Sequence, residues 1–491
     1  MNTTIRSAAI YGITVAPTGV VATRGVRGRE AGRPIKIVGL ATRLVRERAM
    51  LLRSALIASG VELPEEGITL KVTPALGGHT WMGADLALAV ASVVSCGLGC
   101  ALDWTGDTLF YAELGFDGRL RPVRGTLAVA LACPGAGVRR LFVPRECAAE
   151  ASVVPGLEVI AAGSLAEVID LVSALSDPAP SWARSLEEDQ IRDGGPDFAD
   201  VRGLEAAKRA FEVAAAGGYH MLLTGPPGSG KTMLAKRLAS ILPPMTGDEI
   251  LETSVVHSVA GLLGGGAVVR GRTFRAPHHT VSRAGLFGGG AGAARPGEVS
   301  LAHNGILFLD ELPEFDAALL EELRHPLDSG TVSVGGAEPV TLPVRFMLVA
   351  ARTACPCGRH SDPSGSCRCT PQQIGRYRSG VPSALLDRIS IRIELPAIRY
   401  AELGEPADGE SSAVIRARVI EARLRRSRRL SAFGVQARTN AELPDSDRLH
   451  VQAIAQTIAD LAGRDWITED DVAEAIGYRT GDPLAAAAAG W

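Results

Sequence analysis

Hydrophobic and polar residues follow a mixed pattern in the first third of the chain. Short runs of alternating apolar and polar positions predict β-strands, and stretches with apolar residues three or four positions apart predict helices. The predicted strands cover residues 7–15, 19–23, 34–38, 67–73, 108–114, 119–123 and 140–143, and the predicted helices cover 42–59, 85–95, 125–133 and 165–175. We therefore expect an N-terminal α+β domain, without a motif that carries chemistry in its own right.

The pattern changes after a polar segment that is rich in Pro, Ser, Gly and charged residues, as linkers are. Beyond it, apolar runs at 221–223, 306–309 and 343–351 do not alternate, which is typical of buried strands in a parallel sheet. The fold class expected for this part is α/β. The predicted division is an N-terminal domain at 1–173, a linker at 174–195, an α/β domain at 196–398 and a helical C-terminal domain at 399–491.

A glycine-rich turn follows the first of these apolar runs. It matches G-x-x-x-x-G-K-[ST] with Gly225, Pro226, Pro227, Gly228, Ser229, Gly230, Lys231 and Thr232. Glycines let backbone N–H groups turn toward phosphate oxygens, and the N-terminus of the following helix adds a partial positive charge. Lys231 is predicted to reach the β- and γ-phosphates of ATP, and Thr232 to ligate Mg²⁺. A chance glycine turn before a helix is the alternative.

Two acidic residues follow the apolar run at 306–309. Asp310 and Glu311 stand where a parallel strand is expected to end, which is the edge at which open α/β sheets bind ligands. Asp310 is predicted to hold Mg²⁺ through water, and Glu311 to polarise the attacking water. Solvation of a sheet edge is the competing interpretation. The phosphate-binding pattern upstream favours ATP binding and hydrolysis.

Four of the eight cysteines form a cluster with the spacing C-x-C-x₉-C-x-C around a polar turn. The cluster comprises Cys355, Cys357, Cys367 and Cys369. Four thiolates close in sequence suit a tetrahedral Zn²⁺ ion, and His360 is a further candidate ligand. The alternatives are reduced thiols in a tight loop and a redox-switching pair. The other four cysteines lie among apolar residues and are predicted to be reduced core residues.

Composition and net charge exclude few classes of function. The 491-residue chain has a net charge of −3, so any nucleic-acid contact must come from a local basic surface. A predicted helix at 412–430 carries seven arginines, which form either a phosphate-tracking surface or a solvated helix face. No signal peptide is expected, and the apolar stretch at 86–102 is too short and too rich in glycine to span a membrane. We expect a cytoplasmic protein without a membrane partner.

Several stretches resemble the ComM/YifB family of magnesium-chelatase-like AAA+ ATPases. They are residues 37–56, 113–132, 196–232, 275–280, 295–303 and 373–391. The resemblance implies a P-loop AAA+ ATPase core, an N-terminal domain with a ribosomal-S5/Lon-like fold, and a short C-terminal helical lid. A Ser–Lys protease dyad is not expected, because the candidate segment at 77–85 contains no serine and departs from the family.

The resemblance also implies roles for residues outside the glycine loop. Thr353 takes the position of an Asn that orients the attacking water in the family. Arg388 is the candidate for an arginine finger that reaches the γ-phosphate bound by a neighbouring subunit. Arg376 and Arg378 are either alternative fingers or pore-side DNA contacts, and a structural salt bridge is the competing interpretation for all three. The candidates beside the adenine are Val201, Arg202 and Gly203.

Two further regions carry family features. The region at 275–303 resembles an insertion that faces the pore of a ring, where it has either a structural role or direct contact with the substrate. Its adjacent His278 and His279 suggest a metal, but no acid is paired with them in the sequence, and 285–292 is predicted to be a loop. The lid is predicted to be shortened and to lack its sensor arginine. The residues at the positions where the family tends to have arginine are His450, Ala453 and Gln456.

These features predict an ATP hydrolase that assembles as a homo-hexameric ring. By resemblance, it would use ATP and Mg²⁺ to move on single-stranded or branched DNA, as a helicase in branch migration during recombination and natural transformation. One alternative is a chelatase-type motor that remodels a protein or a metal-insertion partner. A third is an ATP-binding scaffold with weak turnover, which Thr353 and the shortened lid favour.

Overall fold

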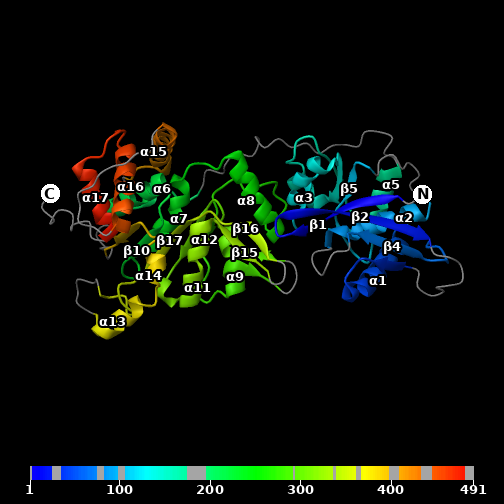
Figure 1. Cartoon of the computed structure of the whole chain (residues 1–491), viewed down its shortest axis with the longest axis horizontal. Coiled ribbons are helices and arrows are strands. Elements are labelled where there is room, and N and C mark those ends of the chain that lie inside the picture. Colours follow the sequence, from blue (N-terminus) through cyan, green and yellow to red (C-terminus); the bar gives the residue numbers. More distant parts are fainter. Residues whose placement is uncertain are drawn as a thin grey trace.

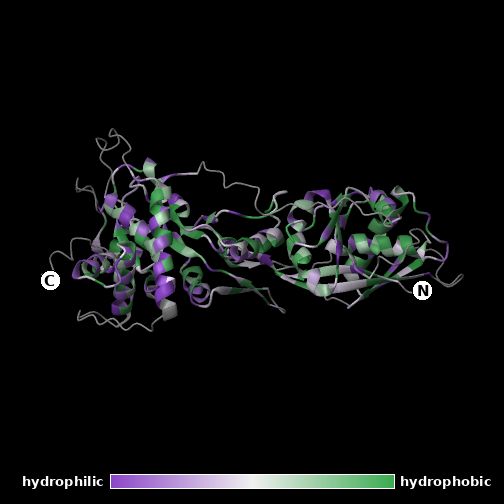
Figure 2. Cartoon of the chain, turned by 90° about the horizontal axis from the view of Figure 1, so that it is seen from above, coloured by the Kyte–Doolittle hydropathy of each residue, from purple (hydrophilic) through white to green (hydrophobic). Residues whose placement is uncertain are grey.

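The computed structural model describes residues 3–24, 35–74, 82–97, 106–173, 195–290, 294–335, 339–360, 367–396, 409–432 and 445–480. Figure 1 shows an elongated molecule, with one sheet near the N-terminus, a second sheet in the middle and a group of helices near the C-terminus. Figure 2 shows hydrophobic residues on both helices and strands of these parts. The predicted linker lies almost entirely outside the described residues. None of the described helices combines the length and the apolar content needed to cross a membrane.

The first sheet is built from the N-terminal third of the chain and has seven strands in the order β3-β4-β2-β1-β5-β8-β9. They are β1 (Thr4–Tyr11), β2 (Thr14–Arg24), β3 (Ile35–Val38), β4 (Ile68–Thr73), β5 (Thr108–Phe110), β8 (Arg140–Pro144) and β9 (Glu158–Ala162). The β1–β2 and β2–β4 pairs are antiparallel, and the other neighbours are parallel. The sheet is therefore mixed, in keeping with the expected α+β class.

Two predicted strands in this region differ from the observed ones. The prediction of one strand over 7–15 is wrong, because the chain reverses at Gly12, whose φ is 60°, and Tyr11 pairs with Thr14. Glycine adopts this left-handed conformation without a Cβ clash, so a two-residue loop closes the hairpin. Apolar residues continue through the turn and conceal it in the pattern. The predicted strand at 108–114 is divided into β5 and β6 (Glu113–Leu114), and β6 pairs with β7 (Leu120–Arg121).

Helix α2 (Asp85–Ser95) forms the centre of the N-terminal core. The other helices here are α1 (Thr42–Ala58), α3 (Thr126–Ala132), α4 (Ala148–Ala151) and α5 (Leu165–Ser173). Almost every residue of α2 is buried, including Asp85 at its start. The Asp85 carboxylate lies 2.5 Å from an Nη of Arg48 on α1. Burial raises the pKa of Asp85 to about 7, and the nearby Arg48 guanidinium opposes this rise.

The second sheet has five strands in the order β11-β14-β17-β10-β18, and every neighbouring pair is parallel. They are β10 (Met221–Thr224), β11 (Phe274–Arg275), β14 (Ile306–Leu309), β17 (Met347–Arg352) and β18 (Ile391–Glu394). Alternate residues of β10 and β14 enter two separate hydrophobic cores, so both faces are covered. The predicted strand at 343–351 begins only at Met347, because β16 (Val340–Pro343) pairs with β15 (Thr331–Val334) instead.

Helices and short strands surround this parallel sheet. They are α6 (Glu205–Gly217), α7 (Lys231–Ile241), α8 (Gly247–Ala260), α9 (Arg283–Phe287), β12 (Gly288–Gly289), β13 (Arg295–Pro296), α10 (Glu298–Leu301), α11 (Ala317–Glu322), α12 (Arg324–Ser329), α13 (Pro371–Arg378) and α14 (Ser383–Leu386). The prediction of a loop over 285–292 is wrong for its first residues, which end α9 and form β12. That strand pairs with β13, so the insertion contains a short hairpin.

Three helices close the C-terminal end of the described chain: α15 (Ser412–Ala432), α16 (Asp445–Leu461) and α17 (Glu469–Thr480). Four arginines of α15 bond to other parts of the chain. Arg423 and Arg426 donate to backbone carbonyls at the end of α6, and Arg418 and Arg429 pair with carboxylates. The predicted phosphate-tracking surface or solvated face is therefore wrong for these four residues. They hold α15 against its neighbours.

Helix α8 joins the two sheets. At its C-terminal end, Ser258 Oγ donates to the Glu150 carboxylate at 2.6 Å and accepts from the Leu127 N–H at 3.3 Å. Val255 and Val259 of α8 enter the hydrophobic core of the first sheet. Desolvation raises the pKa of the buried Glu150, which the Ser258 hydroxyl partly offsets.

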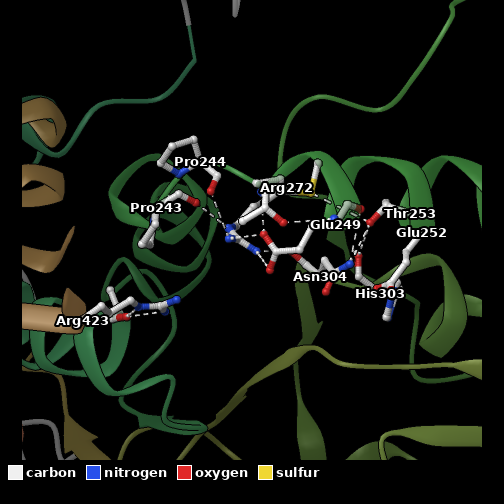
Figure 3. A network of polar contacts seen from close by, with 12 residues as sticks. Pro243, Pro244, Glu249, Glu252, Thr253, Arg272, His303, Asn304 and Arg423 are labelled. Carbon is white, nitrogen blue, oxygen red and sulfur yellow. Dashed lines mark hydrogen bonds and ion pairs between the residues drawn. The ribbon is translucent and has the colours of Figure 1, made fainter. Parts of the chain in front are cut away.

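A polar network fixes the other end of α8 to the parallel sheet (Figure 3). Arg272 donates to the carbonyls of Pro243 and Asn304 at 2.7 Å each, and its Nη2 lies 3.1 Å from the Glu249 carboxylate of α8. Since Asn304 lies two residues before β14, the network links α8 to the strand that carries the predicted acidic pair.

Candidate nucleotide site

The glycine loop joins β10 to α7 at the carboxyl edge of the parallel sheet. Gly228 and Gly230 have φ angles of 79° and 85°, a region that residues with a Cβ adopt only under strain. Lys231 Nζ donates to the carbonyls of Gly225 and Pro226 at 2.9 and 2.8 Å. Burial lowers the pKa of Lys231, and the charges of two nearby acids, Asp310 and Glu311, oppose this shift. The ammonium group is therefore held over the loop, where phosphates would enter.

The two predicted Mg²⁺ ligands meet beside this loop. Thr232 Oγ1, in the first turn of α7, donates to Asp310 Oδ2 at 2.8 Å. Asp310 directly follows β14, which is separated from β10 by β17 alone. A hydroxyl and a carboxylate fit a Mg²⁺ ion that keeps several waters and contacts phosphates. The parallel sheet thus gathers residues that are far apart in the sequence.

Glu311 lies next to Asp310 in an uncommon backbone conformation. Its φ is 54°, in the left-handed region that non-glycine residues seldom adopt, and strain of this kind clusters at functional sites. Its side chain is 64% exposed, and Oε2 lies 3.4 Å from His279 Nδ1. The expectation that no acid is paired with His278 or His279 is therefore wrong. The two residues are far apart in the sequence, so no local pattern revealed the pair. They meet because β11 and β14 are parallel neighbours whose ends lie at one edge of the sheet.

Thr353 follows β17 at the same edge, and its hydroxyl has two partners. Oγ1 donates to the Cys355 carbonyl at 2.8 Å, and the Tyr377 hydroxyl lies 2.8 Å away. Because Thr353 has a single hydroxyl proton, Tyr377 is the donor in the second bond. Burial raises the pKa of Tyr377, so the phenol keeps its proton. The sequence analysis missed Tyr377, and no local pattern singles it out.

Comparison with known proteins gives consistent matches over most of the chain. The family model for magnesium chelatase, subunit ChlI, matches residues 197–403, and the model for subunit ChlI of Mg-chelatase matches residues 26–147. The chain is 36% identical to the uncharacterized protein YifB of Salmonella typhimurium, and the match covers 92% of this chain and 92% of YifB. It is 35% identical to the competence protein ComM of Haemophilus influenzae, over 91% of this chain and 92% of ComM. The chain belongs to the ComM/YifB family of magnesium-chelatase-like proteins.

The cysteine cluster of this ComM/YifB family member is compact. The Sγ atoms of Cys355, Cys357 and Cys367 are separated by 3.3–3.7 Å, and all four Sγ atoms, with that of Cys369, lie within 4.8 Å of one another. A tetrahedral zinc ion with Zn–S bonds of about 2.3 Å requires S–S separations of about 3.8 Å. The donor set therefore fits zinc. Within the described part of the chain, the metal-ligand group does not include His360.

The cysteine loop also contacts the glycine loop. A Cβ placed on Gly358 would lie 2.8 Å from Cδ of Pro227, so the two loops pack without room for a side chain. On its other side, the cluster leads into α13, which carries Tyr377. A hollow of about 530 Å³ borders the cluster and is lined by Pro356, Cys357, Cys369, Gln373, Arg376 and Tyr377. The cluster is thus joined to both Thr353 and the glycine loop.

The predicted finger residue Arg388 is paired within its own chain. Its Nε and Nη2 lie 2.6 and 2.5 Å from the two carboxylate oxygens of Asp328 on α12, and Nη1 donates to the Ala384 carbonyl. Arg376 and Arg378 are exposed on α13, and Arg378 Nε donates to the Ala354 carbonyl at 3.3 Å. Arg388 therefore forms the structural salt bridge that was the competing interpretation, and its side chain remains partly exposed.

The predicted adenine side and the lid helices pack into the same hydrophobic core as β10. Val201 is buried, and Gly203 and Leu204 have consecutive positive φ angles of 61° and 60°. Sequence analysis missed Leu204, whose strained backbone starts α6. In the lid, His450 Nδ1 lies 3.0 Å from Ser390 Oγ, which joins α16 to the end of the parallel sheet.

Proposed function

We propose that this protein is an ATP-dependent motor of the magnesium-chelatase-like AAA+ type. The observation that carries the proposal is the bond between Thr232 Oγ1 and Asp310, which lies beside the Lys231 ammonium at the carboxyl edge of the sheet. In this proposal, the glycine-loop N–H groups and Lys231 bind the phosphates, and Thr232 and Asp310 hold Mg²⁺. Glu311 orients and deprotonates the attacking water, and Thr353 contacts that water or the γ-phosphate.

The proposal includes the domain division at residues 173, 195 and 398, the ribosomal-S5/Lon-like character of the first domain and a cytoplasmic location. It also includes a homo-hexameric ring in which Arg388 leaves Asp328 and reaches a neighbour's nucleotide. The Arg388 side chain is 28% exposed and Asp328 is 51% exposed, so solvent screening keeps the cost of breaking their pair low. The ring is needed because a finger completes the site of an adjacent chain.

The substrate in this proposal is single-stranded or branched DNA, and the motor acts as a helicase in branch migration. Similarity to a protein named for competence supports a role in recombination and natural transformation. The magnesium chelatase family models support a second candidate, a motor that remodels a protein or a metal-insertion partner. The two bonds of the Thr353 hydroxyl favour a third, an ATP-binding scaffold with weak turnover.

ATP turnover by purified protein tests these functions, measured alone and with single-stranded or forked DNA. We expect DNA to stimulate turnover and Lys231→Ala and Arg388→Ala each to abolish it. Arg324→Ala, which alters an exposed arginine on α12, is the matched control for Arg388. Mixing the two inactive variants should restore partial turnover, because some interfaces then combine an intact Lys231 with an intact Arg388. ATP binding without turnover in any condition would favour the scaffold.

We further propose that the four clustered cysteines hold one structural zinc ion. The sulfur separations, close to those of a zinc tetrahedron, support this assignment. Elemental analysis of the purified chain should find about one zinc per chain, which Cys357→Ser or Cys369→Ser removes. Cys96→Ser, at a half-buried cysteine of the first domain, is the control that should retain zinc. Zinc-free protein with unchanged stability would contradict the proposal and favour reduced thiols.

A further inference from the structure

We infer that the cysteine cluster is a control site for nucleotide binding, in which the zinc-held turn at residues 355–358 positions the glycine loop through Gly358 and Pro227. The inference rests on the proposed ATP site and on the proposed zinc ion. It goes beyond both, because it makes the affinity for ATP and the affinity for zinc depend on each other. The cysteines then regulate the motor, and do not only stabilise its fold.

The turn at residues 355–358 is built around one carbonyl group. The Cys355 carbonyl accepts the Gly358 N–H at 3.0 Å, which closes the turn, and it also accepts the Thr353 hydroxyl at 2.8 Å. The φ of Gly358 is 73°, a conformation that residues with a Cβ seldom adopt. Cys355 and Cys357 supply two of the four clustered sulfurs, so a metal ion held by the cluster fixes the shape of this turn.

Gly358 brings the turn against the glycine loop. A Cβ built on Gly358 would lie 2.8 Å from Cδ and 2.9 Å from Cγ of Pro227, so even a methyl group would collide with the ring. The pyrrolidine ring is part of the backbone of Pro227, and a rotamer change cannot move it out of the way. A displaced turn therefore moves the backbone of the glycine loop, whose N–H groups are proposed to bind phosphates.

The same turn has a second contact with the nucleotide site, on the side of β17. Thr353 Cγ2 lies 3.6 Å from the Cβ position of Gly358, and the Thr353 hydroxyl depends on the Cys355 carbonyl for one of its two bonds. Arg378 Nε donates to the Ala354 carbonyl at 3.3 Å, which ties the start of the turn to α13. The cluster is therefore anchored on one side and presses on the glycine loop on the other.

The exposure of the cysteines suits reversible metal binding. Cys357 is exposed, and Cys367 and Cys369 are partly exposed, whereas Cys355 is buried. Solvent therefore reaches the cluster without unfolding of the chain, and the metal can leave and return while the parallel sheet stays intact. A site of this kind can change its occupancy during the life of the protein, as a control site requires.

The zinc affinity of the full chain, measured with and without a bound nucleotide, tests this inference. Coupling between two binding sites is reciprocal. We expect a saturating non-hydrolysable ATP analogue with Mg²⁺ to raise the affinity for zinc by about 5-fold or more, the low end for coupled sites, in competition with a chromophoric chelator. Removal of zinc should weaken binding of the analogue by the same factor. In Lys231→Ala the analogue should leave the zinc affinity unchanged, which also controls for zinc taken up by free analogue.

A double-mutant cycle tests whether the coupling passes through the contact with Pro227. Gly358→Ala should retain zinc but weaken binding of the analogue by about 5-fold or more. In a Pro227→Ala background the same change should cost clearly less, because the two nearest ring atoms are gone. Equal losses in both backgrounds would overturn the inference. Gly156→Ala is the matched control, since its φ is 76° and no described residue beyond its chain neighbours lies within 4 Å of a Cβ built there.

The possible outcomes separate this inference from the proposals on which it rests. If the chain binds both zinc and the analogue but neither affinity responds to the other ligand, the inference is overturned and the ATP site stands. If wild type does not bind the analogue, the proposed ATP site fails as well. If the purified chain contains no zinc and takes none up, the metal assignment fails and the inference fails with it.

Discussion

The two sheets of this protein use their polar side chains in different ways. In the mixed N-terminal sheet, Asp85 pairs with Arg48 inside the core, and Glu150 accepts a bond from Ser258 of α8. These contacts hold elements together. In the parallel sheet, the polar residues Asp310, Glu311 and Thr353 follow strand ends and gather at one edge. Parallel strands direct their carboxyl ends to the same side, so this sheet brings its polar side chains together at one edge. The polar contacts of the mixed sheet lie at separate places in its core.

The largest effect should come from the carboxylate at the edge of the parallel sheet. Glu311→Gln should lower ATP turnover by about 10²–10⁴, the usual contribution of a general base, and change the free energy of unfolding by less than about 0.5 kcal/mol. The small stability change follows from the exposure of the side chain. Turnover assays and thermal melts measure both quantities, with Glu62→Gln on the first domain as a control. A large loss of stability would mean that this edge is structural too.

The second largest effect should occur in the mixed sheet and should be purely structural. Arg48→Ala should lower the stability of the first domain by about 3 kcal/mol at pH 8, because it leaves the Asp85 carboxylate buried without its partner. Hydrogen exchange of the α2 amides reports this locally, and ATP turnover per folded molecule should not change. A loss of turnover without faster exchange of the α2 amides would show that this ion pair affects catalysis, which would contradict its purely structural role.

The same ion pair predicts a pH dependence. The pKa of Asp85 is raised from 3.8 to about 7 on folding, so the folded state keeps a proton that the unfolded state has lost. Stability therefore falls as pH rises from about 4 to 7, and it is highest below this window. In Asp85→Asn, α2 exchange should lose this dependence. If wild type and Asp85→Asn respond identically to pH, the titrating group lies elsewhere.

An intermediate effect is expected where the sheets meet. Ser258→Ala removes a donor from the buried Glu150 and an acceptor from the Leu127 N–H, at a cost of about 1–3 kcal/mol. Limited proteolysis should then separate the two parts of the chain faster. Ser240→Ala on α7 also removes a hydroxyl but lies away from this contact, and it serves as the control. Unchanged proteolysis would show that the apolar contacts of α8 suffice.

The smallest effect should come from the hydrogen bond behind Thr353. Tyr377→Phe deletes one bond worth about 0.5–1.5 kcal/mol, so turnover should change by about 2–10-fold. A decrease would mean that the bond holds Thr353 in its working position, and an increase would favour the scaffold with a restrained hydroxyl. Zinc content should stay the same, and its loss would instead assign the effect to the cysteine cluster.

Local sequence was sufficient for features that depend on neighbouring residues. The glycine loop was recognisable because its conformation needs residues without a Cβ at 228 and 230, followed directly by a helix. The apolar runs before Asp310 and after residue 343 predicted buried parallel strands, although the second begins only at Met347. The hairpin at Gly12 was missed, because apolar residues continue through the turn and periodicity alone does not mark a reversal.

Contacts between distant segments were decided by the tertiary structure alone. The strand order brings His279 to Glu311, the cysteine loop to Pro227, and Tyr377 to Thr353. The run of arginines in α15 suggested a basic surface, but in the structure some of them bond to residues of α6 and α16. The sequence determined which groups this protein contains and where its strands and turns could form. Which of those groups meet depended on how the sheets assemble, since pairing between distant strands leaves no local pattern.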